Sequence, residues 1–264
     1  MGKIRLDQLV FEQGRAESRE KAKALIMAGS VYVDGQKQTK PGMSVPEDAN
    51  LEVRGDKMPF VSRGGFKLQK ALDVFGIDPK DLVCVDCGAS TGGFTDCLLQ
   101  RGAKHVYAVD VGYGQLAWSL RSDERVTVME RQNARNLTPD MFPEAMDMAV
   151  MDMSFISLRL VLPAVKSLLK EEGQVVCLVK PQFEAGREKV GKKGVVRDPA
   201  VHREVLEDFI ETARALGYVL MGLDFSPVRG PEGNIEYLAW LKTGGEGVEP
   251  DCGDVVRRSH EELG

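Results

Sequence analysis

The stretch Val83-Cys-Val-Asp-Cys-Gly-Ala-Ser-Thr-Gly-Gly-Phe94 decides the fold of this chain. An apolar run over residues 82–85 is typical of a buried parallel strand, and it ends at Asp86. A loop with three glycines follows, and helical spacing resumes over residues 94–101. A strand that leads through a glycine loop into a helix is how a doubly wound sheet presents a nucleotide at its first crossover. We therefore predict an α/β, Rossmann-like fold with a nucleotide site at this loop.

The spacing of the loop indicates which nucleotide it binds. A second apolar strand, residues 105–109, leads to Asp110, 22 residues after Gly88, where a ribose-binding carboxylate is expected. The loop departs from the G-x-G-x-x-G spacing of a dinucleotide site because Ser90 replaces the second glycine, and Asp86 would repel a phosphate. Two acids around a small loop favour a cationic, phosphate-free nucleoside, S-adenosyl-L-methionine. A dinucleotide site and a generic glycine-rich turn are the alternatives.

The predicted cofactor contacts lie on this loop and at the ends of neighbouring strands. They are Asp86, Gly88, Ala89, Ser90, Thr91, Gly92, Gly93, Phe94, Asp110, Val111, Asn133 and Asp152. Asn133 is expected at the adenine, although a turn or cap role suits an asparagine there equally well.

The remaining apolar runs complete one sheet. Five more strands are predicted at residues 125–129, 145–151, 174–179, 218–225 and 234–241, with a helix at 199–216 before the last two. The last two strands are joined without a helix, so the final strand runs antiparallel. Seven strands in this arrangement form the class I methyltransferase sheet.

The first 56 residues are expected to form a separate small α+β domain. Apolar stripes predict helices at residues 5–13 and 19–28, and short strands are expected at 30–33 and 50–53, with an Asp34-Gly35 hairpin turn. So small a module buries little core. We expect domains at residues 1–56 and 63–244, a linker at 57–62, and a polar tail at 245–264 with at most a short helix.

Charge is distributed unevenly along the chain. The net charge is −5, but residues 1–70 hold 13 Lys and Arg against 9 Asp and Glu, so this part carries +4 and the rest −9. Basic side chains along the second helix can follow a phosphate backbone, although a solvated helix face is the simpler interpretation. The predicted RNA-binding residues are Arg5, Arg15, Ser18, Arg19, Lys21, Lys23 and Arg63.

Composition narrows the protein class further. There is no apolar run of the roughly 18–20 residues that span a bilayer, and the N-terminus lacks the apolar core of a signal peptide, so we expect a cytoplasmic protein. Five cysteines in a reducing compartment are expected as free thiols. The pair Cys84 and Cys87 has no partner pair at zinc-binding spacing, so no metal site is predicted.

Four charged residues are expected to meet at one edge of the sheet. Asp152 and Lys180 directly follow the fourth and fifth strands, and the carboxyl ends of parallel strands share one crevice. Glu236 lies early in the last strand, which runs backwards and so begins at that edge. Lys67 comes from the helix before the first strand. Each residue alone could be a surface ion pair, but together at one edge they indicate a catalytic set.

This set beside an S-adenosylmethionine site points to methyl transfer onto a ribose 2′-hydroxyl. Such a hydroxyl is a poor nucleophile until it loses its proton. Lys180 is the candidate base; burial favours its neutral form and the neighbouring acids oppose this, so the balance stays open. Lys67 is expected to stabilise the alkoxide, Glu236 to orient the lysines, and Asp152 to border the transferred methyl group.

These motifs resemble a known family. The order Arg5-Leu-Asp, Ser18-Arg19 and Leu25-Ile-x-x-Gly-x-Val-x-Val-Asp-Gly35 is similar to the S4 RNA-binding domain. With Val61-Ser-Arg-Gly-Gly-Phe-Lys67, Lys180-Pro-Gln-Phe-Glu184 and the motifs above, residues 3–242 resemble TlyA-type methyltransferases, often labelled hemolysins and related to FtsJ. The resemblance implies S-adenosylmethionine-dependent 2′-O-methylation of cytidine in 16S or 23S rRNA, or both, and ribosomal subunits as partners.

Two other classes of function are weighed against this one. A membrane-lytic hemolysin would need a secretion signal, a spanning segment or a strongly amphipathic cationic helix, and none is found. A non-catalytic RNA-binding or ribosome-assembly protein would not need the intact Lys–Asp–Lys–Glu set. A tRNA or mRNA acceptor is not excluded, and the oligomeric state is left open.

Overall fold

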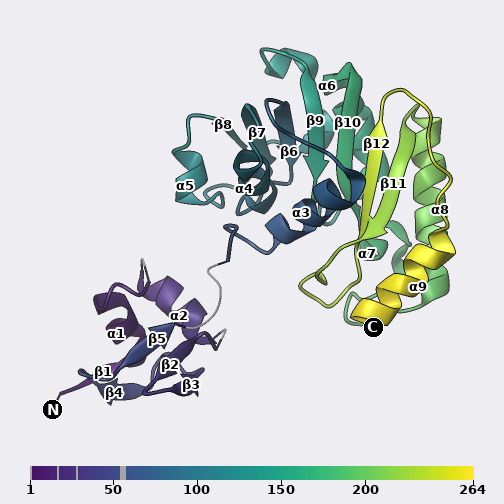
Figure 1. The fold of residues 1–264 in the computed structure, drawn as a ribbon. Coiled ribbons are helices and arrows are strands. Elements are labelled where there is room, and N and C mark those ends of the chain that lie inside the picture. The colour runs from purple at the N-terminus through teal and green to yellow at the C-terminus, as the bar shows by residue number, and fades with distance from the viewer. Residues whose placement is uncertain (1, 17, 28, 54–57) are drawn as a thin grey trace. The chain divides into compact units, whose positions relative to one another are not determined.

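The structure, a computed structural model, describes residues 2–16, 18–27, 29–53 and 58–264. The chain divides into two compact units, Met1–Pro59 and Phe60–Gly264. Figure 1 shows both units, which are described separately below. The domain boundary expected at residue 56, the first linker residue and the last residue of the second predicted helix lie outside the described residues.

The first unit is a small α+β fold. Leu6, Leu9 and Val10 of the first helix pack against Ala22 and Ile26 of the second, as the predicted stripes require. A three-stranded sheet has the order β3-β2-β5, and β1 pairs with β4. The elements are β1 (Lys3–Arg5), α1 (Leu6–Glu12), α2 (Arg19–Met27), β2 (Val31–Val33), β3 (Gln36–Gln38), β4 (Ser44–Pro46) and β5 (Leu51–Val53).

The turn chemistry and the strands β2 and β5 of this unit were predicted from the sequence, whereas β1, β3 and β4 were not. Asp34 and Gly35 have φ of 50° and 79°, as a two-residue hairpin turn between β2 and β3 requires. The Ser18 hydroxyl accepts a hydrogen bond from the Lys21 amide at 3.2 Å and caps α2. Arg5 was expected to begin a helix but ends β1 instead, where Ile4 pairs with Val45 of β4. Each of β1, β3 and β4 contains at most one Val, Ile or Leu, which leaves too little apolar periodicity to predict a strand.

The second unit contains the predicted seven-stranded sheet. Its order is β11-β12-β10-β9-β6-β7-β8, with β12 antiparallel to both neighbours. The strands are β6 (Val83–Cys87), β7 (His105–Asp110), β8 (Val126–Glu130), β9 (Met146–Met151), β10 (Leu169–Val179), β11 (Val219–Phe225) and β12 (Tyr237–Lys242). This is the class I methyltransferase architecture.

Helices cover both faces of this sheet, so its strands are buried on two sides (Figure 1). In β6, Val83, Val85 and Cys87 enter the core on one face, and Cys84 enters the core on the other. The helices are α3 (Gly64–Phe75), α4 (Gly93–Gln100), α5 (Trp118–Arg121), α6 (Leu162–Leu168), α7 (Pro181–Glu184), α8 (Pro199–Ala215) and α9 (Cys252–Leu263), with short turns η1 (Ala134–Asn136), η2 (Pro139–Met141), η3 (Leu158–Leu160) and η4 (Arg187–Lys189).

Several expected boundaries change. The segment expected as a polar tail contains α9, whose Cys252, Val255 and Val256 are buried in the core. Phe60, expected in the linker, is buried against Gly65 at the start of α3. Glu236 directly precedes β12 rather than lying inside it. The three core residues lie within the first five residues of α9, and charged residues dominate the rest of the helix, which explains why the segment was predicted as a polar tail.

The structure bears on three further features: the cysteines, membrane-spanning helices and metal sites. The five cysteines are buried free thiols. Among the described residues, no helix has both the length and the apolar character to cross a bilayer, and no group of His, Cys, Asp and Glu is arranged to hold a metal ion.

Candidate active site

The glycine-rich loop after β6 is held in a conformation that few side chains tolerate. Gly88 and Gly92 have φ of 85° and 100°, in the left-handed region that favours glycine. A Cβ at Gly88 would lie 3.0 Å from the backbone oxygen of Asp152. The amides of Gly88 and Ala89 both donate to the Val109 carbonyl, at 2.9 and 3.0 Å. The loop is therefore fixed between the carboxyl ends of β7 and β9, where open α/β sheets bind ligands.

Asp110, the predicted ribose-binding acid, is bonded directly to this loop. Its Oδ2 accepts from the Ser90 amide at 2.8 Å, and its Oδ1 accepts from the Gly112 amide at 2.7 Å. A carboxylate offers about four lone-pair sites, so two amides leave capacity for hydroxyl donors. Asp110 thus lies directly behind the tip of the loop, available to a ribose placed there.

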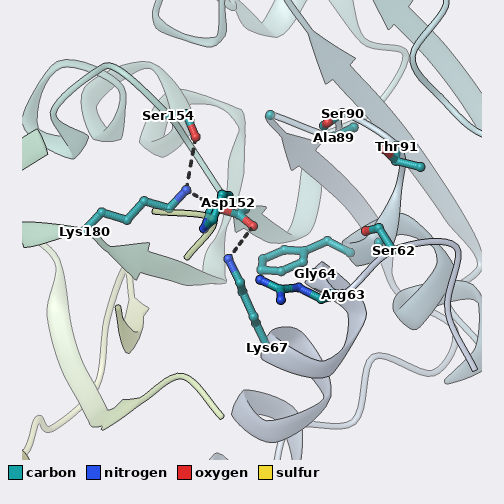
Figure 2. A pocket seen from close by; sticks show the side chains of 14 residues that line it. Ser62, Arg63, Gly64, Lys67, Ala89, Ser90, Thr91, Asp152, Ser154 and Lys180 are labelled. Atoms are coloured by element: carbon teal, nitrogen blue, oxygen red, sulfur yellow. Dashed lines mark hydrogen bonds and ion pairs between the residues drawn. The ribbon is translucent and has the colours of Figure 1, made fainter. Parts of the chain in front are cut away.

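A cavity of about 350 Å³ lies beside the loop, within the size range of small-molecule sites. In Figure 2 the loop residues Ala89, Ser90 and Thr91 lie on one side, and Lys67, Asp152 and Lys180 lie on another. The lining residues are Ser62, Arg63, Gly64, Lys67, Gly88, Ala89, Ser90, Thr91, Gly93, Phe94, Asp152, Ser154, Lys180 and Pro231. Seven of the predicted cofactor residues are among them.

The residues present fit S-adenosylmethionine. Asp152 lines the cavity with a partly exposed carboxylate that can face a sulfonium. Lys67 and Lys180 are held by acids instead of being free to bind a phosphate. Asp110 offers acceptors for ribose hydroxyls beside Ser90. This donor set suits a cationic nucleoside without phosphates.

Asp86 is not brought to the cavity. It is fully buried, and its Oδ2 accepts from the amide and the hydroxyl of Thr95 at 3.0 and 2.7 Å, in the first turn of α4. Its Oδ1 has no hydrogen-bond partner among the described residues. Burial raises the pKa of Asp86 to about 7, and the Thr95 hydrogen bonds act against this rise. In this structure Asp86 fastens the loop to α4.

Four further predicted cofactor residues do not line the cavity, and one of them is Asp110, which bonds to the loop residue Ser90 from behind. Gly92 precedes α4 as its N-cap. Val111 follows β7 and is 66% exposed. Asn133 accepts from the Arg135 amide at 3.2 Å and caps η1, which is the alternative role that its residue type suggested.

The four predicted catalytic residues meet at one wall of the cavity. Figure 2 shows Asp152 between the ends of Lys67 and Lys180. Lys180 Nζ lies 2.5 Å from Asp152 Oδ1, and Lys67 Nζ lies 3.4 Å from Asp152 Oδ2 and 2.6 Å from Glu236 Oε2. Lys180 Nζ is also 4.0 Å from Glu236 Oε1 and 3.2 Å from Ser154 Oγ. Two acids and two lysines thus form one ion-paired cluster.

Burial within the cluster is uneven. The side chains of Lys67, Lys180 and Glu236 are 8%, 7% and 1% exposed, whereas that of Asp152 is 21% exposed. Burial tends to lower the pKa of Lys67, but the nearby Asp152 and Glu236 carboxylates outweigh it and the pKa is raised. Lys67 is therefore charged at neutral pH. Asp152 is the member of the cluster most open to a ligand.

Glu184, which sequence reasoning left without a role, joins two of the loops that carry this cluster. Its carboxylate accepts from the Ser157 hydroxyl at 2.5 Å and from the Leu158 amide at 2.8 Å. Burial raises the pKa of Glu184, and the bonds to Ser157 and Leu158 act against the rise. The segments after Asp152 and Lys180 are therefore held together by a partly buried acid.

Asn234 performs a comparable function beside Glu236. Its Oδ1 accepts from the Val196 amide at 3.0 Å, and its Nδ2 donates to the Gly194 carbonyl at 2.9 Å. The Val196 carbonyl lies 3.0 Å from His202 Nε2, and His202 Nδ1 lies 2.7 Å from the Tyr237 hydroxyl. Asn234 directly, and Tyr237 through His202, thus hold the backbone of Val196 in the basic 186–198 loop.

Close helix packing brings α3 to the cavity, which spacing alone did not reveal. A Cβ at Gly93 would lie 2.3 Å from Ser62 Oγ and 2.8 Å from the Gly65 amide nitrogen. Ser62, Gly64, Ser154 and Pro231 line the cavity and were not predicted. The Gly64-Gly65 pair was the available signal, because adjacent glycines allow close approach.

The predicted RNA-binding residues divide between the two units. Arg63 lines the cavity and donates to the Arg229 carbonyl at 3.0 Å. In the first unit, Arg5 and Arg19 both contact Asp7. The others lie before and along α2: exposed Arg15, the cap residue Ser18, exposed Lys21, and Lys23, which lies 3.8 Å from Glu20.

Comparison with known proteins agrees with the division of the chain into two units. The family model of the FtsJ-like methyltransferases matches residues 60–243, and that of the S4 domain matches residues 4–51. The chain is 56% identical to "Putative rRNA methyltransferase YqxC" of Bacillus subtilis, over 99% of this chain and 95% of that protein. It is 48% identical to 16S/23S rRNA (cytidine-2'-O)-methyltransferase TlyA of Mycobacterium tuberculosis, over 91% and 90%.

A solved structure extends the likeness to three dimensions. The protein described as "Putative hemolysin from Streptococcus thermophilus" superimposes with a TM-score of 0.79 at 48% identity, covering 99% of this chain and 97% of that one. Sequence, fold and domain order therefore agree over nearly the full length. The chain belongs to the TlyA/hemolysin family of FtsJ-like methyltransferases with an N-terminal S4 domain.

Proposed function

We propose that this chain transfers a methyl group from S-adenosylmethionine to the 2′-hydroxyl of a cytidine in 16S or 23S ribosomal RNA, or both, in the cytoplasm. The observation that carries the proposal is the buried cluster of Lys67, Asp152, Lys180 and Glu236 on the cavity wall. The rRNA (cytidine-2'-O)-methyltransferase named above, at 48% identity, supports the substrate class.

Lys180 is proposed as the base. Its Nζ reaches the cavity between Asp152 and Ser154 and can meet a hydroxyl placed there. A neutral Lys180 Nζ would take the proton of the ribose hydroxyl as its oxygen bonds to the methyl carbon, and the carbon–sulfur bond of the donor would break to leave S-adenosylhomocysteine. When bound, S-adenosylmethionine supplies the methyl group as a sulfonium, which is already a good leaving group.

Lys67 and Glu236 have different proposed roles. Because two carboxylates raise its pKa, Lys67 keeps its charge and can stabilise the oxygen as negative charge develops on it. Glu236 is 1% exposed and contacts both lysines, so it orients them without facing substrate. Asp152 lines the cavity and contacts Lys180, so a donor bound beside Asp152 would have its methyl carbon near the proton acceptor.

Ribose-methylation mapping on ribosomal subunits tests the proposal. Subunits from a strain that lacks the gene are incubated with S-adenosylmethionine, with and without the purified chain, and analysed by mass spectrometry. We expect one or more cytidine 2′-O-methyl groups to be missing in the deletion strain and restored by the protein. A complete methylation pattern in the deletion strain would contradict the proposal.

Calorimetry distinguishes the proposed methyltransferase from a non-catalytic RNA-binding protein. We expect the chain to bind S-adenosylmethionine, and Asp110→Ala to weaken that binding, because Asp110 lies behind the loop tip. A chain that binds rRNA but not the cofactor would be an RNA-binding protein instead. Lysis of erythrocytes by both wild-type protein and Lys180→Ala would favour the hemolysin interpretation.

A further inference from the structure

Asp7 of α1 is a fully buried acid in a unit expected to bind a polyanion. Its Oδ1 lies 3.0 Å from Arg5 Nε, and its Oδ2 lies 3.2 Å from Arg5 Nη2. The same Oδ2 lies 3.1 Å from Arg19 Nη2, and Oδ1 also accepts from the Gln8 amide at 3.1 Å. One carboxylate therefore fixes two guanidiniums that come from β1 and α2.

The two guanidiniums stay accessible while the acid does not. The side chains of Arg5 and Arg19 are 52% and 42% exposed, and that of Asp7 is 0% exposed. Arg5 presents its Nε–Nη2 edge to Asp7, which leaves Nη1 and its outer donors for another acceptor. Because both arginines contact the same oxygen, their donor groups lie within one phosphate-sized region.

The Arg5 guanidinium holds the pKa of Asp7 below its usual range, so the carboxylate is charged at neutral pH. On charge alone, this acid opposes RNA binding, because it cancels one positive charge beside the arginines. Its benefit to binding must therefore be geometric. A flexible arginine loses side-chain freedom when it meets a phosphate, whereas a held one has already lost it.

We propose that Asp7 is a positioning residue for RNA binding, which holds Arg5 and Arg19 as a preformed pair for the phosphate backbone. The inference rests on the proposed function, because it assumes that the first unit binds ribosomal RNA. It assigns to an acid a part in recognising a polyanion. Arginine suits this arrangement because its planar fork bonds to a carboxylate on one edge and to a phosphate on another.

Asp7→Asn tests the inference, because a positioning role and a purely electrostatic role of Asp7 predict opposite changes in RNA affinity. The substitution keeps the shape of the side chain and makes the unit more positive by one charge. Loss of positioning predicts about tenfold weaker binding of the full chain to unmodified 16S and 23S rRNA transcripts. A purely electrostatic role predicts tighter binding and a steeper dependence on salt.

Glu12→Gln is the matched control, because it makes the same charge change at an exposed site on the same helix. We expect its affinity for the transcripts to equal or slightly exceed that of the wild type. If Asp7→Asn binds as tightly as Glu12→Gln or more tightly, the inference is overturned. If the wild-type chain fails to bind either transcript, the proposed function fails with it, so the two failures are distinguishable.

A second variant decides the matter if Asp7→Asn does not fold, as circular dichroism and one-dimensional NMR would reveal. The double variant Arg5→Lys and Arg19→Lys keeps both charges and loses the planar forks that Asp7 holds. We expect its affinity to fall at least tenfold without a steeper salt dependence. Unchanged affinity would overturn the inference.

Discussion

Two clusters in this molecule have the same plan, a carboxylate between two cations, and opposite exposure. In the first unit, Asp7 is buried and its partners Arg5 and Arg19 are about half exposed. In the second unit, Lys67 and Lys180 are buried and Asp152 is partly exposed. The first cluster presents positive charge outward, which suits a polyanion; the second presents an acid to a cavity, which suits a cationic donor.

The choice of cation separates binding from chemistry. Arginine stays protonated at any physiological pH, so the first cluster can hold a phosphate but cannot take a proton. Lysine can lose its proton when its surroundings change, so the second cluster can act as a base. Exposure and cation type together distinguish the two functions.

Lys180→Arg tests this difference directly, because it replaces the proposed base with arginine, the cation found in the cluster around Asp7. We expect methyl transfer to rRNA to fall about 10³-fold, because a permanent cation cannot accept the hydroxyl proton. Radiolabelled methyl transfer measures the rate, and calorimetry should show cofactor affinity near the wild-type value. Lys166→Arg, whose lysine bonds to the Leu216 carbonyl away from the cavity, is the control. Transfer retained in Lys180→Arg would exclude Lys180 as the base.

Glu236→Gln sharpens the comparison by removing one carboxylate while keeping its shape. Lys67 then has one acid instead of two to oppose the effect of burial, so its pKa falls. We expect kcat to fall about a hundredfold with little change in KM, since the loss concerns charge that develops in the transition state.

Steady-state kinetics at several rRNA concentrations separate kcat from KM for Glu236→Gln. Glu204→Gln is the control, because it removes a surface acid that pairs with Lys189. A rise in KM alone would mean that Glu236 helps to bind RNA and does not organise the lysines.

Strand topology explains why the meeting of Asp152 and Lys180 was predictable. Asp152 and Lys180 directly follow strands that run parallel, so their positions in sequence imply one edge of the sheet. The outer supports were not predictable in this way. Glu184 accepts a hydrogen bond from the Leu158 amide, and Asn234 accepts one from the Val196 amide. Sequence periodicity does not indicate which distant backbone group a side chain will contact.

Asp86 and Asp7 illustrate the same limit. Both acids lie in motifs that were noticed, but their roles depend on burial. Asp86 was expected at the cofactor, and the structure turns it toward Thr95 instead. Asp7 was not assigned a role, because nothing in its spacing shows that α2 brings Arg19 to it.

Asn234→Ala tests whether the support beside Glu236 matters for catalysis. Removing the amide frees the Val196 peptide from the chain segment that carries Glu236. We expect kcat to fall about tenfold, with cofactor affinity unchanged, since a small misplacement near reacting groups is costly. Faster hydrogen exchange at the Val196 amide should accompany the fall.

Tyr218→Phe controls for the loss of a buried hydrogen bond in general. The Tyr218 hydroxyl donates to the Leu162 carbonyl at 2.9 Å, away from the cavity. An equal fall in kcat in both variants would show that Asn234 contributes only stability.

Asp86→Asn extends the comparison to a buried acid that forms no ion pair with a lysine or arginine among the described residues. Because burial raises the pKa of Asp86 to about 7, the folded state keeps a proton that the unfolded state releases near pH 4. Its contribution to stability is therefore lost as pH rises from about 4 to about 7. His202 acts in the opposite sense: burial lowers its pKa to about 4, so its contribution is lost as pH falls from about 6.5 to about 4.

The effects of Asp86 and His202 oppose each other between about pH 4.5 and 6.5, so together these two groups change the stability of the wild-type protein little across this range. Asp86→Asn removes one of them, and its free energy of unfolding should fall on acidification by up to about 1.4 kcal/mol per pH unit. Urea unfolding followed by tryptophan fluorescence measures this, because Trp118 and Trp240 both lie in the second unit. The surface variant Asp140→Asn should follow the wild type. If Asp86→Asn also follows it, then Asp86 is ionised in the folded protein, and a buried acid without a cation can be as charged as Asp7.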